Sequence, residues 1–232
     1  MKDLNNHVVK HLLADGINAV GISPCINIPS LCAHGGDEGG GATTFVASIR
    51  EALHAGLIPV VHGDAGLYGS PYDLDTLSGG ILGGDTLVEI ISSHNLLHIS
   101  TCIFLTDVDG VYTKDPKANP GDAKLMDRID VDAVTGEIIT ENINASGSSH
   151  AHDVTGGLKV SFIEYIFYWY SVYLNKVQTK LKAAAAIAKN GTDVIIAKCA
   201  SKTAERIMKN LGDDFPENLG GHTIVRSYMR ES

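Results

Sequence analysis

The stretch that decides the fold is Ile103-Phe104-Leu105-Thr106-Asp107-Val108-Asp109-Gly110-Val111-Tyr112. Its first three residues form an apolar run typical of a strand that is buried on both faces of a parallel sheet. Ligands of open parallel sheets bind just beyond the carboxyl ends of the strands. Asp107, Asp109 and Gly110 would lie there. The stretch therefore predicts either a ligand site at a sheet edge or a plain Asp-Gly turn after a strand.

Helical and strand-like patterns alternate along the rest of the chain. Helices are predicted over residues 4–15, about 43–54, 180–190 and from Ser201 to near Gly212, and strands over 17–22, 57–61, 193–197 and 222–228. Gly191 follows the alanine-rich helix as its expected C-terminal cap. This alternation predicts an α/β fold with a mainly parallel sheet.

Three further segments combine glycine with polar residues. His62-Gly63-Asp64 follows one predicted strand, and Gly83-Gly84-Asp85 precedes a helix that Thr86 and Glu89 would open as a capping box. Glycines at a helix start let backbone N–H groups approach an anion, although a simple capped loop explains the same residues. The glycine-rich run 35–41 lacks the Lys-Ser/Thr ending of a P-loop and the spacing of a dinucleotide fingerprint. A flexible loop is the favoured interpretation of that run.

Length, net charge and cysteine content limit the classes of protein to which the chain can belong. The 232 residues suit one medium domain or two small ones, of which we expect a single domain over 1–232, and the net charge of −9 argues against a nucleic-acid surface. The cysteines form no CxxC pair, which favours reduced thiols in a cytosolic protein. The polar amino terminus carries no signal-peptide pattern. We therefore expect a cytoplasmic protein without a membrane span.

Four segments taken together resemble one family. They are His62-Gly63-Asp64, Gly83-Gly84-Asp85-Thr86-Leu87, the run from Thr106 to Tyr112 with Lys114-Asp115-Pro116, and Asp153-Val154-Thr155-Gly156-Gly157. The chain resembles the amino acid kinase superfamily, and within it the isopentenyl phosphate kinases. The Thr106–Pro116 pattern occurs across the superfamily, including uridylate kinase and glutamate 5-kinase. The combination with the other motifs, and with Gly21-Ile22-Ser23-Pro24-Cys25, indicates the narrower group.

The resemblance implies a three-layer α/β/α sandwich, commonly dimeric, that transfers the γ-phosphoryl group of ATP to a small phosphate monoester with Mg²⁺ bridging the ATP phosphates. It implies catalytic roles for Asp85, which would orient cations, and for Lys180. It implies an acceptor site at Gly63, Asp64 and Gly84. The nucleotide site that it implies comprises Asp107, Gly110, Val111, Tyr112, Asp115, Pro116, Gly156, Gly157 and Lys180. No protein ligand to a metal ion is implied.

The chain departs from the family pattern before its first motif. The family begins with a strand and a glycine loop of the type KLGGS, followed by a GxGxFGH segment that supplies a lysine, backbone donors and a histidine. These residues do not precede Met1. We therefore expect the first strands of the fold to be lacking and kinase activity of the chain as written to be near background, because several charge-stabilising groups would be missing at once.

A second departure separates Lys180 from the glycine turn that should position it. The segment 160–178 adds 19 residues after Lys159 and holds seven of the fourteen aromatic residues of the chain. A membrane-touching segment, a genuine aromatic arm and a retained intron remain as interpretations. Val160 and Gln178 can be encoded by codons that contain intron-end sequences, which favours the intron. Removing the segment restores the family spacing at Lys180.

The predicted function is therefore ATP-dependent phosphorylation of isopentenyl phosphate to isopentenyl diphosphate. A different acceptor, such as uridine monophosphate, is the alternative among enzymes. A non-catalytic nucleotide-binding or dimerising remnant is the alternative from another class of protein. Turnover of each acceptor, and nucleotide binding without turnover, distinguish these readings.

Overall fold

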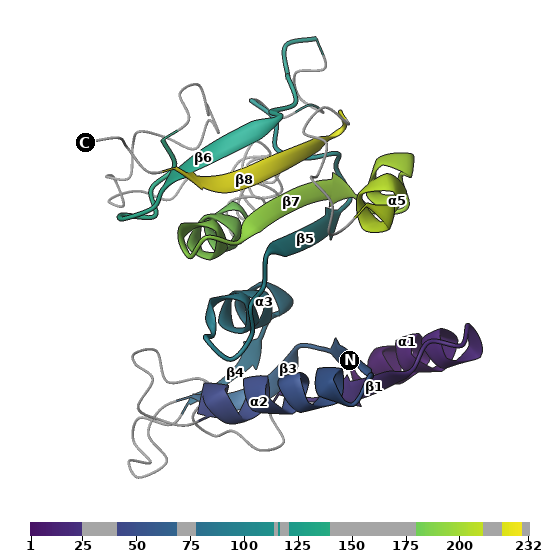
Figure 1. Ribbon diagram of the computed structural model, residues 1–232. Helices are drawn as coiled ribbons and strands as arrows, with labels where there is room; N and C mark the ends of the chain where they lie inside the picture. The colour runs from purple at the N-terminus through teal and green to yellow at the C-terminus, as the bar shows by residue number, and fades with distance from the viewer. Residues whose placement is uncertain are drawn as a thin grey trace, which may run out of the picture. The chain divides into compact units, whose positions relative to one another are not determined.

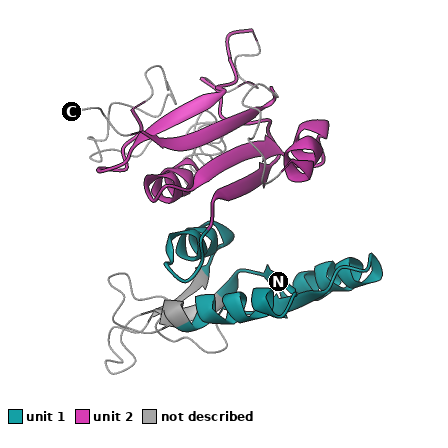
Figure 2. Cartoon of the chain, in the orientation of Figure 1, with its two compact units in different colours: residues 1–98 teal, residues 99–232 magenta. Residues whose placement is uncertain are grey.

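The computed structural model describes residues 1–24, 41–68, 78–113, 116, 121–139, 180–210 and 220–228. The chain divides into two compact units, residues 1–98 and 99–232, which are described here separately (Figure 2). The predictions for Asp115, Gly156, Gly157, the loop 35–40 and the segment 160–178 lie outside the described residues. None of the helices in the described ranges combines the length and apolar character that crossing a bilayer requires.

The first unit contains two pairs of strands and three helices (Figure 1). In chain order these elements are α1 (Lys2–Ala14), β1 (Ala19–Ile22), α2 (Gly41–His54), β2 (Ile58–Val61), β3 (Asp64–Tyr68), β4 (Ser78–Leu82) and α3 (Gly84–Ser93). β1 and β2 pair in parallel, with Ile22 opposite Val61. β3 and β4 form an antiparallel pair with Asp64 opposite Leu82.

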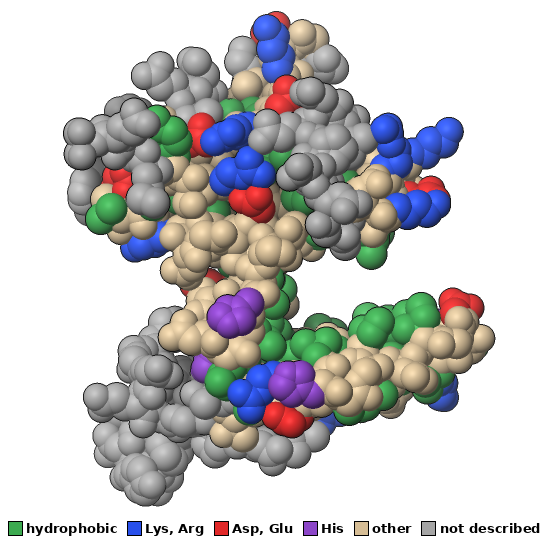
Figure 3. All heavy atoms as spheres, viewed as in Figure 1, with side chains coloured by type: hydrophobic (Ala, Val, Ile, Leu, Met, Phe, Trp, Pro, Cys, Tyr) green, Lys and Arg blue, Asp and Glu red, His purple; other side chains and the backbone are tan. Residues whose placement is uncertain are grey.

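Helix α1 is fastened to the parallel pair by a buried asparagine. The side chain of Asn5 is almost fully buried and donates a hydrogen bond of 2.7 Å to the carbonyl oxygen of Val60. A Cβ atom at Gly21 would collide with the Asn5 side chain, so glycine is required there for the helix to approach β1. The same helix exposes Leu4, Val8 and Leu13, and hydrophobic side chains gather along it in Figure 3.

The core of this unit lies between α2, β4 and α3. Its buried members are Phe45, Val46, Ile49, Leu82 and Leu87, with Ile22 and Val61 packed against them. Of these residues, Phe45, Val46 and Ile49 belong to α2, and their helical spacing places them on one face of that helix. This packing holds the end of β4 and the start of α3 against the ends of β1 and β2.

The second unit is built on one four-stranded sheet. Its elements are β5 (Thr101–Thr106), β6 (Arg128–Asp132), a helix over 180–189, β7 (Asp193–Lys198), α5 (Lys202–Lys209) and β8 (His222–Tyr228). The strand order is β5-β7-β8-β6. The β5–β7 and β6–β8 pairs are parallel, and the β7–β8 pair is antiparallel.

Helices cover opposite faces of β5. Ile103 packs against the cluster that contains Ile207 of α5. The next residue, Phe104, points to the other face because successive strand residues alternate, and its ring lies 5.6 Å from Nζ of Lys180. The unit therefore has helix, sheet and helix layers, and the predicted α/β class with mainly parallel pairing is confirmed.

Most predicted elements are confirmed within a few residues. Ser201 caps α5 as expected, since its Oγ accepts a hydrogen bond of 3.0 Å from the backbone N–H of Ala204. The helix ends at Lys209, before the predicted Gly212. The capping box at Thr86 is wrong: α3 starts at Gly84 with Gly83 as N-cap, and no side chain caps it.

Strands β3, β4 and β6 were not predicted. β4 contains Gly79 and Gly80, which read as loop residues because glycine weakens an isolated strand. In β6, fully buried Ile129 and Val131 alternate with charged residues. That alternation is the ordinary pattern of a strand with one buried face.

Candidate functional site

The first unit brings two of the predicted glycine motifs together. Gly63 follows β2, and a Cβ atom at this position would lie 2.7 Å from the carbonyl oxygen of Leu82 and 3.8 Å from Cα of Gly83. A contact of 2.7 Å is too short for a carbon and a backbone oxygen, so only glycine fits here. Backbone packing therefore brings the His62-Gly63-Asp64 and Gly83-Gly84 motifs together.

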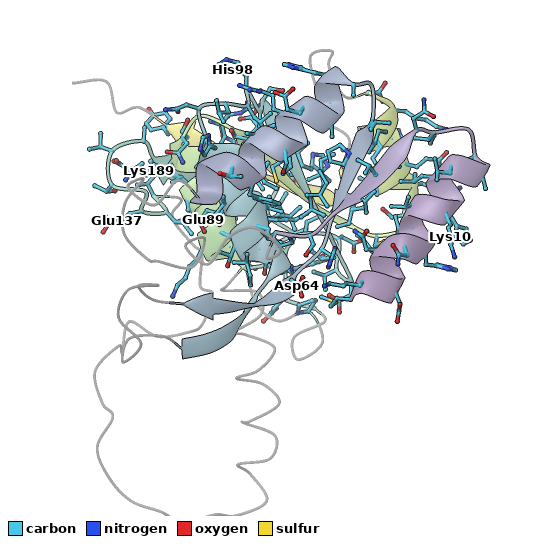
Figure 4. The ribbon with its side chains drawn as sticks, turned by 90° about the horizontal axis from the view of Figure 1, so that it is seen from below. Lys10, Asp64, Glu89, His98, Glu137 and Lys189 are labelled. Carbon is cyan, nitrogen blue, oxygen red and sulfur yellow. The ribbon has the colours of Figure 1, made fainter. Side chains whose placement is uncertain are left out.

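The carboxylate of Asp64 is held by three side chains. Ser23 Oγ donates a hydrogen bond of 2.6 Å to Asp64 Oδ2. Lys2 Nζ lies 3.8 Å from the same oxygen, and His62 Nε2 lies 3.9 Å from it. Asp64 stands at the start of β3, where Figure 4 labels it. The Asp64 carboxylate therefore has a hydrogen bond from Ser23, and the side chains of Lys2 and His62 lie near it.

Gly84 and Asp85 form the start of α3. Gly83 is extended and exposed, Gly84 is exposed, and an added Cβ would meet nothing within 4 Å at either glycine. Backbone N–H groups at a helix start attract anions, and open space around the glycines lets a ligand come close. Asp85 is half-buried in the first turn, where the helix dipole stabilises a negative charge.

The second unit anchors the turn after β5 on the last strand. A Cβ atom at Gly110 would collide with Oγ1 of Thr223 and would lie 3.0 Å from Cδ1 of Leu125. Thr223 is fully buried, and its Oγ1 accepts a hydrogen bond of 2.8 Å from the N–H of Val111. The same hydroxyl donates a bond of 2.6 Å to the carbonyl oxygen of Met126. One side chain therefore joins the turn, the segment before β6 and β8.

The two ends of the turn are fixed as well. Thr106 Oγ1 bonds with both the carbonyl oxygen (2.8 Å) and the N–H (3.2 Å) of Val108. The Tyr112 hydroxyl donates to Asp109 Oδ2 at 3.0 Å. Backbone bonds from Met126 to Val111 (2.8 Å) and from Thr113 to Lys124 (2.9 Å) extend the turn into a short antiparallel ladder. Asp107 is exposed directly after the strand, so the turn presents this carboxylate to solvent from a well-fixed backbone.

Two other predicted residues belong to this unit. Lys180 starts the described part of the 180–189 helix, and its ammonium group lies over the ring of Phe104 on β5. A cation over an aromatic face is stabilised by the ring quadrupole. Pro116 is half-buried. Lys180 therefore lies on a helix that packs against β5, the strand that leads to the Asp107 turn.

Sequence reasoning missed three residues that shape these sites. Ser23 and His62 contact or approach Asp64, and Thr223 anchors Gly110 and Val111. Ser23 and His62 each follow a predicted strand, and this position at the carboxyl end of a strand could have marked them as candidate site residues. Thr223 carried none, because its role depends on a contact 112 positions away. Within the described ranges, no group of three or more His, Cys, Asp or Glu side chains is arranged to hold a metal ion.

Comparison with known proteins identifies relatives of the whole chain. The model of the amino acid kinase family matches residues 1–166. Isopentenyl phosphate kinase of Arabidopsis thaliana is 31% identical over 97% of this chain and 60% of its own length. The enzyme of the same name from Methanothermobacter thermautotrophicus is 37% identical over 68% of this chain and 52% of its own length. The chain thus spans about half to three-fifths of the length of these relatives.

Solved structures share the fold. A crystal structure of Thermoplasma acidophilum isopentenyl phosphate kinase in a product complex superimposes with a TM-score of 0.56 at 20% identity, covering 97% of this chain and 67% of that one. X-ray structures of isopentenyl phosphate kinase give a TM-score of 0.51 at 25% identity over 86% of this chain and 58% of that one. Since the family model matches well over half of the residues, the chain belongs to the amino acid kinase family.

Proposed function

We propose that this chain carries the ATP-dependent phosphorylation of isopentenyl phosphate to isopentenyl diphosphate. Relatives that bear the name isopentenyl phosphate kinase match it over 97% and 68% of its length. The structural observation that carries the proposal is the packing of Gly63 against Leu82 and Gly83, which brings the two glycine motifs of the acceptor site together.

The acceptor phosphate is assigned to the first unit. Gly63, Asp64 and Gly84 offer backbone groups in a setting where two glycines leave room for a ligand. Asp85, in the first turn of α3, would hold a cationic group in place for the transferring phosphoryl group. Phosphoryl transfer depends mainly on such positioning and on charge stabilisation.

ATP is assigned to the second unit. Asp107, Gly110, Val111, Tyr112 and Pro116 would line the nucleotide pocket, and Thr223 keeps Gly110 and Val111 in place. Lys180 would stabilise charge on the ATP phosphates. Asp115, Gly156 and Gly157 belong to the same proposal on the strength of the sequence.

Mg²⁺ fits this arrangement as an ion carried by the nucleotide. It keeps several waters and binds through substrate phosphates with one or two carboxylates, so it needs no dedicated cluster of protein ligands. The turn after β5 offers the carboxylates of Asp107 and Asp109, of which Asp109 also accepts a hydrogen bond from the Tyr112 hydroxyl. The ion would neutralise charge on the ATP phosphates during transfer.

We further propose that residues 1–232 form one kinase domain, that the protein is a cytoplasmic homodimer, and that its partners are small molecules. The family model supports the single domain because its match runs through residue 98, where the two units meet in the sequence. Light scattering coupled to size exclusion tests the dimer, and a fluorescent fusion tests the compartment.

The deciding experiment measures acceptor-dependent ADP formation from ATP with isopentenyl phosphate, uridine monophosphate, aspartate and glutamate as acceptors. Turnover of isopentenyl phosphate above the other three supports the proposal. Preference for uridine monophosphate or an amino acid would assign the chain to another branch of the family. ATP binding without turnover of any acceptor would support a nucleotide-binding remnant instead.

A further inference from the structure

Asp64 Oδ2 is the point where side chains from separate elements of the first unit meet. Ser23 follows β1, His62 follows β2 and Lys2 begins α1. Because β1 and β2 are parallel and Ile22 lies opposite Val61, Ser23 and His62 leave the sheet at the same edge. Asp64 opens β3 directly after them.

The three contacts differ in strength. The Ser23 bond of 2.6 Å is short and charge-assisted, whereas the Lys2 side chain is 63% exposed and its ion pair at 3.8 Å is weak. His62 Nε2 stands 3.9 Å from the carboxylate, beyond hydrogen-bond range, but the imidazole is only 11% exposed. Ser23 is therefore the neighbour that orients the Asp64 carboxylate, and His62 is the mostly buried polar ring that lies beside it.

His62 gives the cluster a feature that packing alone does not explain. Both ring nitrogens are buried, and neither has a hydrogen-bond partner among the described residues. A buried polar atom without a partner destabilises the fold, whereas an apolar ring of similar size would not. Histidine at this position therefore costs stability and is consistent with a role in ligand binding.

The negative charge of Asp64 explains why the carboxylate needs neighbouring protein groups. A free carboxylate beside an acceptor phosphate would repel it, since both are anions. Holding Asp64 Oδ2 with Ser23 and placing His62 beside it keeps the negative charge among protein groups. The carboxylate then fixes the backbone at Gly63 and Asp64, and the tight approach of Gly63 to Leu82 fixes it from the other side.

We propose that Ser23 and His62 are positioning residues of the acceptor site, which hold the Asp64 carboxylate so that the Gly63–Asp64 backbone can bind the phosphate group of a phosphate monoester. This inference rests on the proposed function, because that function assigns the acceptor to this unit. The two residues act through Asp64 and are given no contact with the reacting atoms.

The test measures acceptor and nucleotide affinity separately. Isothermal titration follows binding of isopentenyl phosphate, uridine monophosphate and inorganic phosphate in the presence of a non-hydrolysable ATP analogue. Ser23→Ala, which removes the charge-assisted bond to Asp64, and His62→Phe, which replaces the polar ring beside it, should each weaken binding of the preferred phosphate by about tenfold. Affinity for the ATP analogue should stay unchanged. His62→Phe should leave the melting temperature equal or higher, since it removes unpartnered buried nitrogens.

Conservative and control variants separate positioning from folding. Ser23→Thr keeps a hydroxyl and His62→Gln keeps a polar group, so both should recover most of the lost affinity. Ser48→Ala and His54→Gln, which change the same residue types on α2, should leave acceptor affinity at the wild-type value. Wild-type affinity in both Ser23→Ala and His62→Phe would overturn the inference while leaving the proposed function intact. A wild-type chain that binds the ATP analogue but none of the three phosphates would overturn both.

Discussion

Thr223→Val tests whether one buried hydroxyl holds the nucleotide turn in place. Valine has nearly the same shape as threonine, so the change leaves no cavity. It removes the bond of 2.8 Å from the N–H of Val111 and the bond of 2.6 Å to the carbonyl oxygen of Met126. Leaving a buried backbone donor or acceptor without its partner costs about 1–3 kcal/mol each. The two losses together should lower the free energy of unfolding by about 2–5 kcal/mol.

Urea unfolding followed by circular dichroism measures the stability change, and a fluorescent ATP analogue measures nucleotide affinity. Affinity should fall together with stability, because Val111 is free to move once its N–H is released. Thr203→Val is the matched control: its hydroxyl lies 3.5 Å from the carbonyl oxygen of Gly220 in an exposed setting, so stability should change by less than about 0.5 kcal/mol. A Thr223→Val protein as stable as the control variant would refute the anchoring role.

Four other substitutions test the remaining parts of the argument. Asp107→Asn should weaken ATP binding in a titration with normal circular dichroism, and an unchanged affinity would remove Asp107 from the nucleotide site. Asp85→Ala, tested in a chain that also carries the family-type N-terminal segment, should reduce turnover at saturating substrate more than it reduces ATP affinity, whereas the reverse pattern would contradict an orienting role. Gly84→Ala has open space for its methyl group and should keep or slightly raise the melting temperature while weakening acceptor binding; normal binding would exclude close approach of a ligand there. Arg226→Met removes a two-pronged pair with Asp193 (2.7 and 2.8 Å) that is about one-third exposed and should cost about 1 kcal/mol in urea unfolding, and no loss would show the pair to be neutral.

Local sequence patterns were enough to predict most of the fold. The helices that became α1, α2 and α5 have helical spacing of apolar residues, and the buried strands β5 and β7 are apolar runs of the expected length. The predictions failed where tertiary pairing overrode local preference. Gly79 and Gly80 belong to β4 only because β3 supplies the ladder, with Gly66 opposite Gly80. The local sequence around Gly79 and Gly80 does not show that β3 pairs with this segment.

The candidate sites were partly predictable for the same reason. Gly63 and Gly110 stood out because each lies beside an acid after a predicted strand, and Gly83 because it precedes a predicted helix start. Ser23 was quoted only as part of a motif, and its bond to Asp64 spans 41 positions. Thr223 looked like any other residue of a terminal strand. Contacts between a motif and a side chain from a distant element depend on the tertiary fold, so the sequence alone did not predict them.

The glycines of these sites divide into two kinds, and the division bears on how each site works. At Gly63 and Gly110 a Cβ atom would strike a neighbouring backbone or a buried hydroxyl, so glycine there allows protein to pack on protein. At Gly83 and Gly84 an added Cβ atom would meet nothing within 4 Å, so no protein packing at the Cβ position requires glycine there. The first kind makes the motif backbone rigid, which lowers the entropy lost when a phosphate is bound. The second kind leaves the helix start open to the phosphate itself. The proposed acceptor site needs both properties, and the first unit places them on Gly63 and on Gly83, whose Cα lies 3.8 Å from a Cβ atom built on Gly63.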